Sequence, residues 1–214
     1  MDTGKITVAA FDFDGTLTRR DSLLPFLLYS EGPVNFAIKM TKASPALLAY
    51  AARLMRNDTA KENLLRTFLH RRPLADIEAI GTSFARERVP AMLLDDAYAR
   101  FLWHKAQGHV CVLVSASLIH YLEPWAKSVG FDHVIGSQLA SDGNGQVSGR
   151  LDGGNCYGEQ KASRLRAWLG PGRQSFMPTA IAGVTGKCWR WRTIRITAPC
   201  RKVNEIEKAA GPDS

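Results

Sequence analysis

The stretch FDFDGTLT, residues 11–18, decides how this chain is expected to fold. It closes the run ITVAAFDF (6–13), which is short, apolar and rich in β-formers, as is typical of a buried strand that ends in acids. Asp12 and Asp14 stand two residues apart there, and Gly15 allows a sharp exit from the strand. Two carboxylates this close repel each other unless a cation or a catalytic role compensates. The pattern alone also fits a solvated Asp-Gly turn.

Further strands and helices alternate with this first strand. We expect buried strands at 109–117 and 132–139, a hairpin within 140–151, and helices at 58–72, 74–89, 93–109, 118–130 and 158–170. Alternation of this kind predicts an α/β fold with a parallel sheet. The helical stretch 21–97 is too long for a simple crossover, so we expect it to be an inserted α-helical cap. The core domain then comprises residues 1–20 and 98–176.

Composition and charge narrow the classes of partner. Of the net charge of +8, half comes from the last 38 residues, with seven Lys or Arg and three Asp or Glu. Basicity is therefore weak evidence for nucleic-acid binding, and we expect no specific nucleic-acid partner. The four cysteines lack the spacing of a zinc site, which favours free thiols in a reducing cytoplasm.

Membrane segments are not expected. The residues from Met1 lead straight into an apolar run with an acid at Asp12, unlike a secretory signal. The long apolar segment 34–55 contains Lys39, Lys42, Pro45 and Arg53, so we expect no transmembrane helix. Peripheral contact with a membrane surface stays open, since basic amphipathic helices can lie on anionic lipid.

Three motifs in order carry a family resemblance. FDFDGTLT (11–18), VLVSAS (112–117) and GEQKASRL (158–165) resemble motifs one, two and three of the haloacid dehalogenase (HAD) superfamily. TRRDSLLPF (18–26) and GGNCYGEQK (153–161) resemble its phosphoserine-phosphatase-like branch, which has a helical cap after motif one. The resemblance covers about residues 6–176 and implies a HAD-like, Rossmann-like parallel sheet.

The resemblance implies a role for each matching residue. Asp12 corresponds to the nucleophile that forms an aspartyl phosphate, and Asp14 to the general acid and base. Ser115 and Lys161 correspond to the phosphate-binding residues, although a helix-capping serine and a surface lysine are the ordinary alternatives. The implied cofactor is Mg²⁺, with Asp12 and the main-chain carbonyl of Asp14 as metal ligands.

The fourth family motif, which supplies another metal-binding acid, is absent. After the predicted helix 158–170 the chain continues as SFMPTAIAGVTGKCWRWRTIRIT (175–197), and the next acids are Glu205, Glu207 and Asp213. We therefore expect impaired magnesium binding and low activity.

A lost base after Ser175 would account for this absence. With suitable synonymous codons, residues 176–197 read two bases later encode YAYGDSRGDREMLALADHPYY, which resembles the missing strand, acids and helix. We therefore interpret 177–214 as an atypical, out-of-frame tail. The alternative is a tail whose Trp and Arg side chains bind phosphates and stack on bases.

The predicted function is Mg²⁺-dependent hydrolysis of phosphomonoesters. Arg19 and Arg20 are candidate substrate-contacting residues of the cap. Phosphoserine is disfavoured as substrate because these arginines, and then Asp21, follow motif one where the branch has a substrate-binding acid. A small phosphorylated metabolite or a phospholipid headgroup fits the mixed apolar and basic cap. The alternative function is a non-catalytic chain that binds an anionic partner, either nucleic acid or a membrane surface. The oligomeric state is left open.

Overall fold

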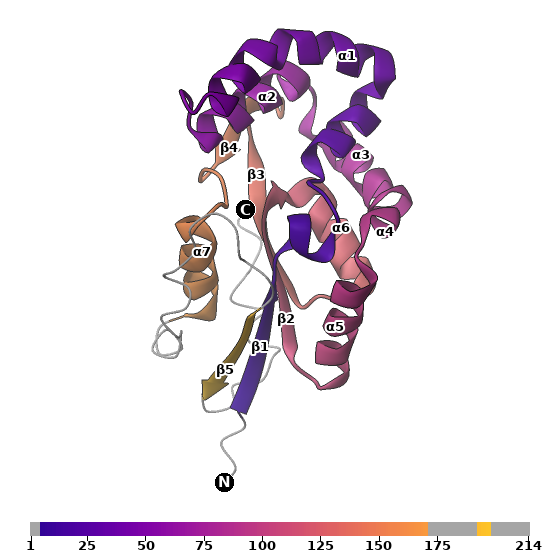
Figure 1. Ribbon diagram of the computed structural model, residues 1–214, viewed down its shortest axis with the longest axis vertical. Coiled ribbons are helices and arrows are strands. Elements are labelled where there is room, and N and C mark those ends of the chain that lie inside the picture. The colour runs from indigo at the N-terminus through magenta and orange to yellow at the C-terminus, as the bar shows by residue number, and fades with distance from the viewer. Residues whose placement is uncertain (1–4, 171–191, 198–214) are drawn as a thin grey trace.

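The computed structural model describes residues 5–170 and 192–197, with side chains for residues 7–170 (Figure 1). Its sheet has the strand order β4-β3-β2-β1-β5. The central strands β1 (Lys5–Phe11), β2 (Val110–Leu118) and β3 (His133–Ser141) run parallel, as the alternating pattern predicted. At the edges, β4 (Val147–Asp152) and β5 (Arg192–Thr197) are antiparallel to β3 and β1. The predicted α/β fold is confirmed, and the pair β3–β4 is the predicted hairpin.

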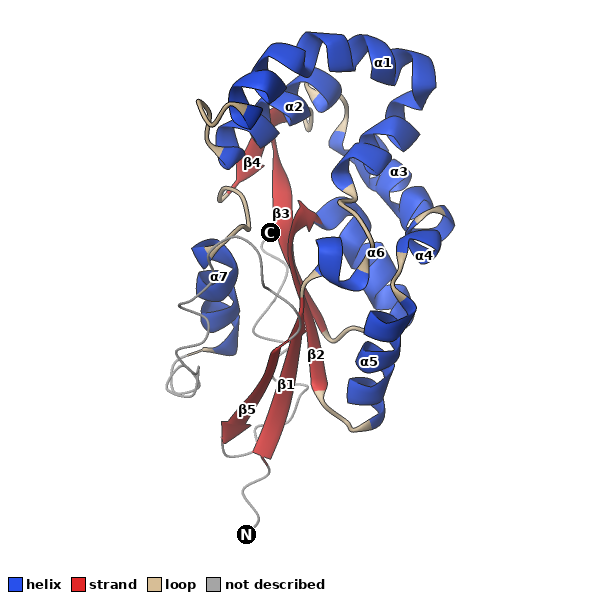
Figure 2. Cartoon of the chain, in the orientation of Figure 1, coloured by secondary structure: helices blue, strands red, loops and turns tan. Residues whose placement is uncertain are grey.

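Helices cover both faces of the sheet (Figure 2). On one face lie α5 (Asp95–Ala106) and α6 (Ile119–Val129), and on the other lies α7 (Glu159–Leu169). The side chains of β1 are apolar on both faces of the sheet. Ala9 and Phe11 belong to one buried cluster, and Val8 and Ala10 belong to the other. A strand buried on both faces is apolar throughout, which explains the continuous apolar run in its sequence.

Four helices are inserted between β1 and α5. They are α1 (Leu23–Ala51), α2 (Asn57–Leu69), α3 (Leu74–Glu87) and α4 (Val89–Met92). Helix α1 bends at Gly32, which has a φ of 73° and precedes Pro33. The second half of α1 runs with α2 beyond the carboxyl ends of the strands (Figure 1). The hairpin β3–β4 meets the end of α2, where Val147 exchanges backbone hydrogen bonds with Arg71 and Arg72.

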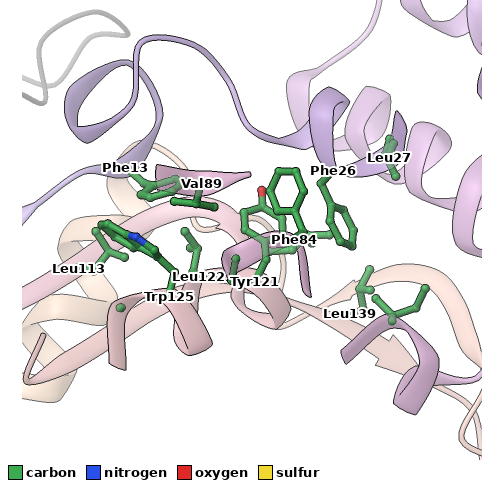
Figure 3. Packing of buried hydrophobic residues seen from close by; sticks show 14 of the residues in the cluster. Phe13, Phe26, Leu27, Phe84, Val89, Leu113, Tyr121, Leu122, Trp125 and Leu139 are labelled. Atoms are coloured by element: carbon green, nitrogen blue, oxygen red, sulfur yellow. The ribbon is translucent and has the colours of Figure 1, made fainter. Parts of the chain in front are cut away.

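The inserted helices are joined to the core by an aromatic cluster (Figure 3). Phe26 of α1 and Phe84 of α3 pack on the ring of Tyr121 in α6, at centroid distances of 4.9 and 5.3 Å. Gly81 of α3 faces the backbone of α6 so closely that a Cβ there would lie 2.2 Å from the carbonyl oxygen of His120. This close packing holds the inserted helices over the sheet.

The unusual tail is described only in part. Of the predicted out-of-frame segment 177–214, residues 192–197 form β5, and the rest lies outside the described residues. Strand β5 pairs with β1 so that Arg192 stands opposite Ala10, which places its first residue near the carboxyl end of β1. Among the helices in the described ranges, none combines the length and the apolar character needed to cross a membrane.

Candidate active site

A cavity of about 390 Å³ lies at the carboxyl ends of β1 and β2. Asp12 follows β1, Ser115 lies in β2, and Lys161 lies in the first turn of α7. Together with Asp14, all three line the cavity. Ligands of open α/β sheets bind at this edge. The structure therefore brings together the four residues that the motifs singled out, although the cavity alone assigns no role to them.

Asp12 is held in place by two contacts. Its Oδ1 atom lies 2.6 Å from Nζ of Lys161 and accepts a hydrogen bond from the backbone N–H of Phe13 at 2.8 Å. Burial raises the pKa of the Asp12 carboxyl, while the Lys161 ammonium lowers it. The side chains of Asp12 and Lys161 are 13% and 7% exposed. A carboxylate fixed by a buried cation is suited to attack an electrophile that carries negative charge.

Asp14 lies in a different environment. The chain leaves the strand in one wide turn, Phe13–Leu17, in which Gly15 adopts a φ of 68°. The Asp14 carboxylate accepts hydrogen bonds from the backbone N–H of Ser22 at 2.9 Å and from the hydroxyl of Ser117. Burial, with the nearby charge of Asp21, raises the pKa of Asp14 to about 6. A carboxyl group that titrates near neutral pH can both donate and accept a proton.

The serines of β2 form a buried network beneath the carboxylates. The Ser115 hydroxyl accepts a hydrogen bond from the backbone N–H of Ser117 at 3.0 Å. The Ser22 hydroxyl lies 3.3 Å from that of Ser117 and 2.8 Å from that of Tyr121. This network ties the start of α1 to β2 and α6, and so fixes the position of Asp14.

Lys61 of α2 was missed by the sequence reasoning. Its Nζ donates to the carbonyl oxygen of Ala116 and, at 3.0 Å, to Oδ1 of Asn155. Burial lowers the pKa of Lys61 to about 8, although the carboxylates of Asp21 and Asp14 oppose that shift. A lysine within an ordinary amphipathic helix carries no signal of such a contact, because only the docking of α2 over β2 creates it.

Asn155 was also missed, although it lies in the quoted stretch GGNCYGEQK. Its Nδ2 donates to Oδ1 of Asn57 at 3.1 Å and to Oδ1 of Asp58 at 3.2 Å, both in α2. Its Oδ1 accepts from the Ser137 hydroxyl at 3.1 Å. Asn155 thus joins the loop before α7 to the inserted helices and to β3.

The part of the cavity lining that comes from α1 and α2, which we call the outer wall, is mainly apolar. Leu23, Leu24, Leu47, Tyr50 and Leu64 line it. Asp21 lines the same cavity as Asp12 and Asp14, so a further carboxylate is available there soon after motif one.

Arg19 and Arg20 are placed elsewhere. They line a second cavity of about 860 Å³ with Arg88, and they are not among the residues that line the cavity of Asp12. Arg19 donates from Nε to the Leu93 carbonyl oxygen at 3.3 Å. Their predicted contact with substrate stays a prediction, and this placement does not support it.

The described residues supply only part of a magnesium site. Magnesium takes oxygen ligands in octahedral geometry, commonly with one or two carboxylates. Asp12 offers a carboxylate oxygen beside the main chain of Asp14, but the Asp14 carboxylate is engaged by Ser22 and Ser117. Within the described part of the chain, no three His, Cys, Asp or Glu side chains gather closely enough to hold a metal ion.

Comparison with known proteins identifies the family. A model of haloacid dehalogenase-like hydrolases matches residues 9–184. Protein CicA of Caulobacter vibrioides is 37% identical over 164 residues, which are 77% of this chain and 73% of CicA. A "Probable phosphatase" of Mycobacterium tuberculosis is 26% identical over 75% of this chain and 56% of its own length.

Two solved structures share the fold of this chain. A protein of unknown function from Bordetella pertussis Tohama I has a TM-score of 0.64 at 25% identity, covering 75% of this chain and 72% of that protein. A phosphoserine phosphohydrolase-like protein from Francisella tularensis shares the fold, with a TM-score of 0.52 at 17% identity over 78% and 75% of the two chains. The chain belongs to the haloacid dehalogenase-like hydrolases.

Proposed function

We propose that this chain hydrolyses phosphomonoesters through an aspartyl-phosphate intermediate on Asp12. The observation that carries the proposal is the convergence of Asp12, Asp14, Ser115 and Lys161 in one cavity at the carboxyl edge of the sheet. Phosphoryl transfer needs a nucleophile, a proton donor and groups that offset negative charge. The four side chains offer one candidate for each task.

In the first step, a carboxylate oxygen of Asp12 attacks phosphorus. The new bond from oxygen to phosphorus forms as the bond from phosphorus to the alcohol oxygen of the ester breaks. Asp14 donates its proton to that leaving oxygen, which its raised pKa favours. Lys161, 2.6 Å from Asp12, and the Ser115 hydroxyl stabilise the charge on the phosphoryl oxygens.

In the second step, water attacks the phosphorus of the aspartyl phosphate. Asp14, now ionised, accepts a proton from that water as the bond from phosphorus to the Asp12 oxygen breaks. Inorganic phosphate leaves, the Asp12 carboxylate is restored, and Asp14 is protonated again. Each proton taken in one half of the cycle is returned in the other.

We propose Mg²⁺ as the cofactor, since it is typical of this family, and expect it to bind weakly here. When bound, the ion would offset the negative charge of the phosphoryl group and the nearby carboxylates. Asp12 and the Asp14 carbonyl would be its protein ligands. Among the described residues, no third His, Cys, Asp or Glu side chain lies close enough to complete a metal site with them, so we expect low turnover from this chain.

We propose that the substrate is a small phosphorylated metabolite or a phospholipid headgroup. The leucines of the outer wall would accommodate an apolar group beyond the phosphate. Asp21 in the same cavity would attract a cationic group, so an amine-bearing substrate fits as well. A cytoplasmic location is proposed on the buried free thiols of Cys111 and Cys156.

The alternative of a non-catalytic chain is not favoured. A chain selected only to bind an anion would not need two buried carboxylates at the centre of its cavity, because these oppose anion binding.

The mechanism is tested by trapping the intermediate with a ³²P-labelled phosphomonoester. The wild-type chain should acquire label that hydroxylamine removes, and Asp12→Asn should acquire none. Label retained by Asp12→Asn would overturn the proposed nucleophile. The impairment is tested separately by titrating Mg²⁺ against turnover in this chain and in one carrying YAYGDSRGDREMLALADHPYY after Ser175. Equal turnover and equal magnesium dependence would contradict it.

A further inference from the structure

An apolar surface covers the outer side of the second half of α1. Positions 34, 38, 41, 45, 48 and 52 recur every three or four residues, which places them on one helix face, and all six are exposed. Val34, Ile38 and Leu48 are 71%, 50% and 69% exposed. Leu54, in the turn that follows, is 83% exposed. Val34, Ile38, Leu48 and Leu54 are together called the apolar stripe.

The stripe is not explained by packing within the chain. The opposite face of α1 is already anchored, because Ala43 belongs to the buried cluster and three partly buried side chains pack against that cluster: Phe36, Met40 and Leu47. Figure 1 shows this part of α1 running across the end of the molecule, with α2 between it and the sheet. Large apolar side chains exposed in a row mark an interaction surface rather than a scatter of single residues.

The charges around the stripe indicate an anionic partner. From Pro33 to Arg56 the chain contains no Asp or Glu. Lys39 is engaged internally, since its Nζ lies 2.8 Å from Glu31 and donates to the Phe68 carbonyl oxygen. Lys42, Arg53 and Arg56 are exposed along the same segment, and Arg56, whose side chain is 87% exposed, lies 3.9 Å from the Asp58 carboxylate.

We propose that the apolar stripe, with Lys42, Arg53 and Arg56, docks this chain onto a bilayer surface that contains anionic lipid. A helix with exposed apolar side chains and flanking bases can lie in the interface, with the apolar side chains among acyl chains and the bases at headgroups. A second copy of the chain fits less well, because a self-paired interface would bring the same three cations together. The docking goes beyond phosphate hydrolysis and does not require it.

Docking would also orient the candidate active site. Leu47 and Tyr50 line the cavity of Asp12, while Leu48 between them belongs to the stripe. One turn of α1 would therefore face both the membrane and the cavity. A lipid-borne phosphomonoester could pass along its side without leaving the interface.

The test is co-sedimentation of the full chain, without substrate, with phosphatidylcholine vesicles that do or do not contain phosphatidylglycerol. The wild type should sediment with phosphatidylglycerol vesicles, more weakly in high salt. The variant Val34→Ser/Ile38→Ser/Leu48→Ser/Leu54→Ser should lose affinity by about tenfold or more. Lys42→Gln/Arg53→Gln/Arg56→Gln should lose the preference for anionic vesicles.

A matched control removes exposed apolar groups elsewhere. Leu102→Ser/Trp103→Ser changes side chains of α5 that are 47% and 44% exposed, and it should bind vesicles like the wild type. Every variant should remain folded at the temperature of the assay, which its unfolding temperature checks; the control variant should unfold below the wild type, because Trp103 contacts Arg100 and His104. The proposal would be overturned if the wild type did not sediment with anionic vesicles, or if the stripe variant bound them as the wild type does. So would a stripe-dependent dimer that does not bind vesicles.

Discussion

Replacing Asp14 with Asn should make the folded chain more stable at pH 8 while it destroys turnover. The pKa of Asp14 is raised from 3.8 to about 6, mainly by burial. The folded chain therefore holds a proton there that the unfolded chain releases. Stability contributed by this group is fully present below about pH 4 and is lost as the pH rises through about 6. Asparagine keeps the shape of the side chain and carries no charge to bury.

The magnitude follows from the shift of about two pKa units. Each unit corresponds to about 1.4 kcal/mol, so ionised Asp14 costs the folded chain about 3 kcal/mol at pH 8. The hydrogen bond from the Ser22 N–H survives in Asp14→Asn, because the amide oxygen accepts it. For a chain of this size, 3 kcal/mol corresponds to a rise in Tm of about 6–12 °C.

Urea unfolding at pH 4.5 and pH 8, followed by far-UV circular dichroism, measures this difference. Asp14→Asn should exceed the wild type in unfolding free energy at pH 8, and most of that excess should disappear at pH 4.5. Asp95→Asn is the control, since that side chain is 97% exposed and should show no such change. An excess that is absent at pH 8, or equal at both pH values, would refute the reasoning.

Three further outcomes are expected. Gly81→Ala should lower the unfolding free energy by about 1–3 kcal/mol, because its Cβ would lie 2.2 Å from a backbone oxygen of α6; Gly143→Ala, which meets nothing within 4 Å, should not. Lys61→Met should destabilise the chain by about 1–3 kcal/mol in the same urea assay, because the Ala116 carbonyl oxygen and Oδ1 of Asn155 are then left with the single hydroxyl proton of Ser137 between them; unchanged stability would show that the contact is dispensable. Asp21→Asn should lower the pKa of Asp14 by removing a like charge, so the pH at which the stability loss is centred should fall; an unmoved profile would contradict that.

Much of the fold and of the candidate site could be predicted from local patterns. The apolar run before Asp12 favoured a strand buried on both faces, because it is short and rich in β-formers and because helices cover both faces of a parallel sheet. The motifs singled out Asp12, Ser115 and Lys161, and the structure brings all three to one cavity at the carboxyl ends of β1 and β2. The helical character of residues 23–92 followed in the same way from apolar spacing.

The features that the sequence left undecided are long-range contacts. Nothing local shows that Lys61 contacts the end of β2, or that Arg19 and Arg20 line a cavity other than that of Asp12. The same holds for the apolar stripe, since a periodic pattern shows that a helix has two faces but not which of them is covered. The sequence by itself determined the strands, the helices and the reactive residue types, because these depend on neighbours within a few positions. Only the tertiary structure decided which side chains are buried together and so which pKa values shift, because burial and charge act across space between residues far apart in the chain.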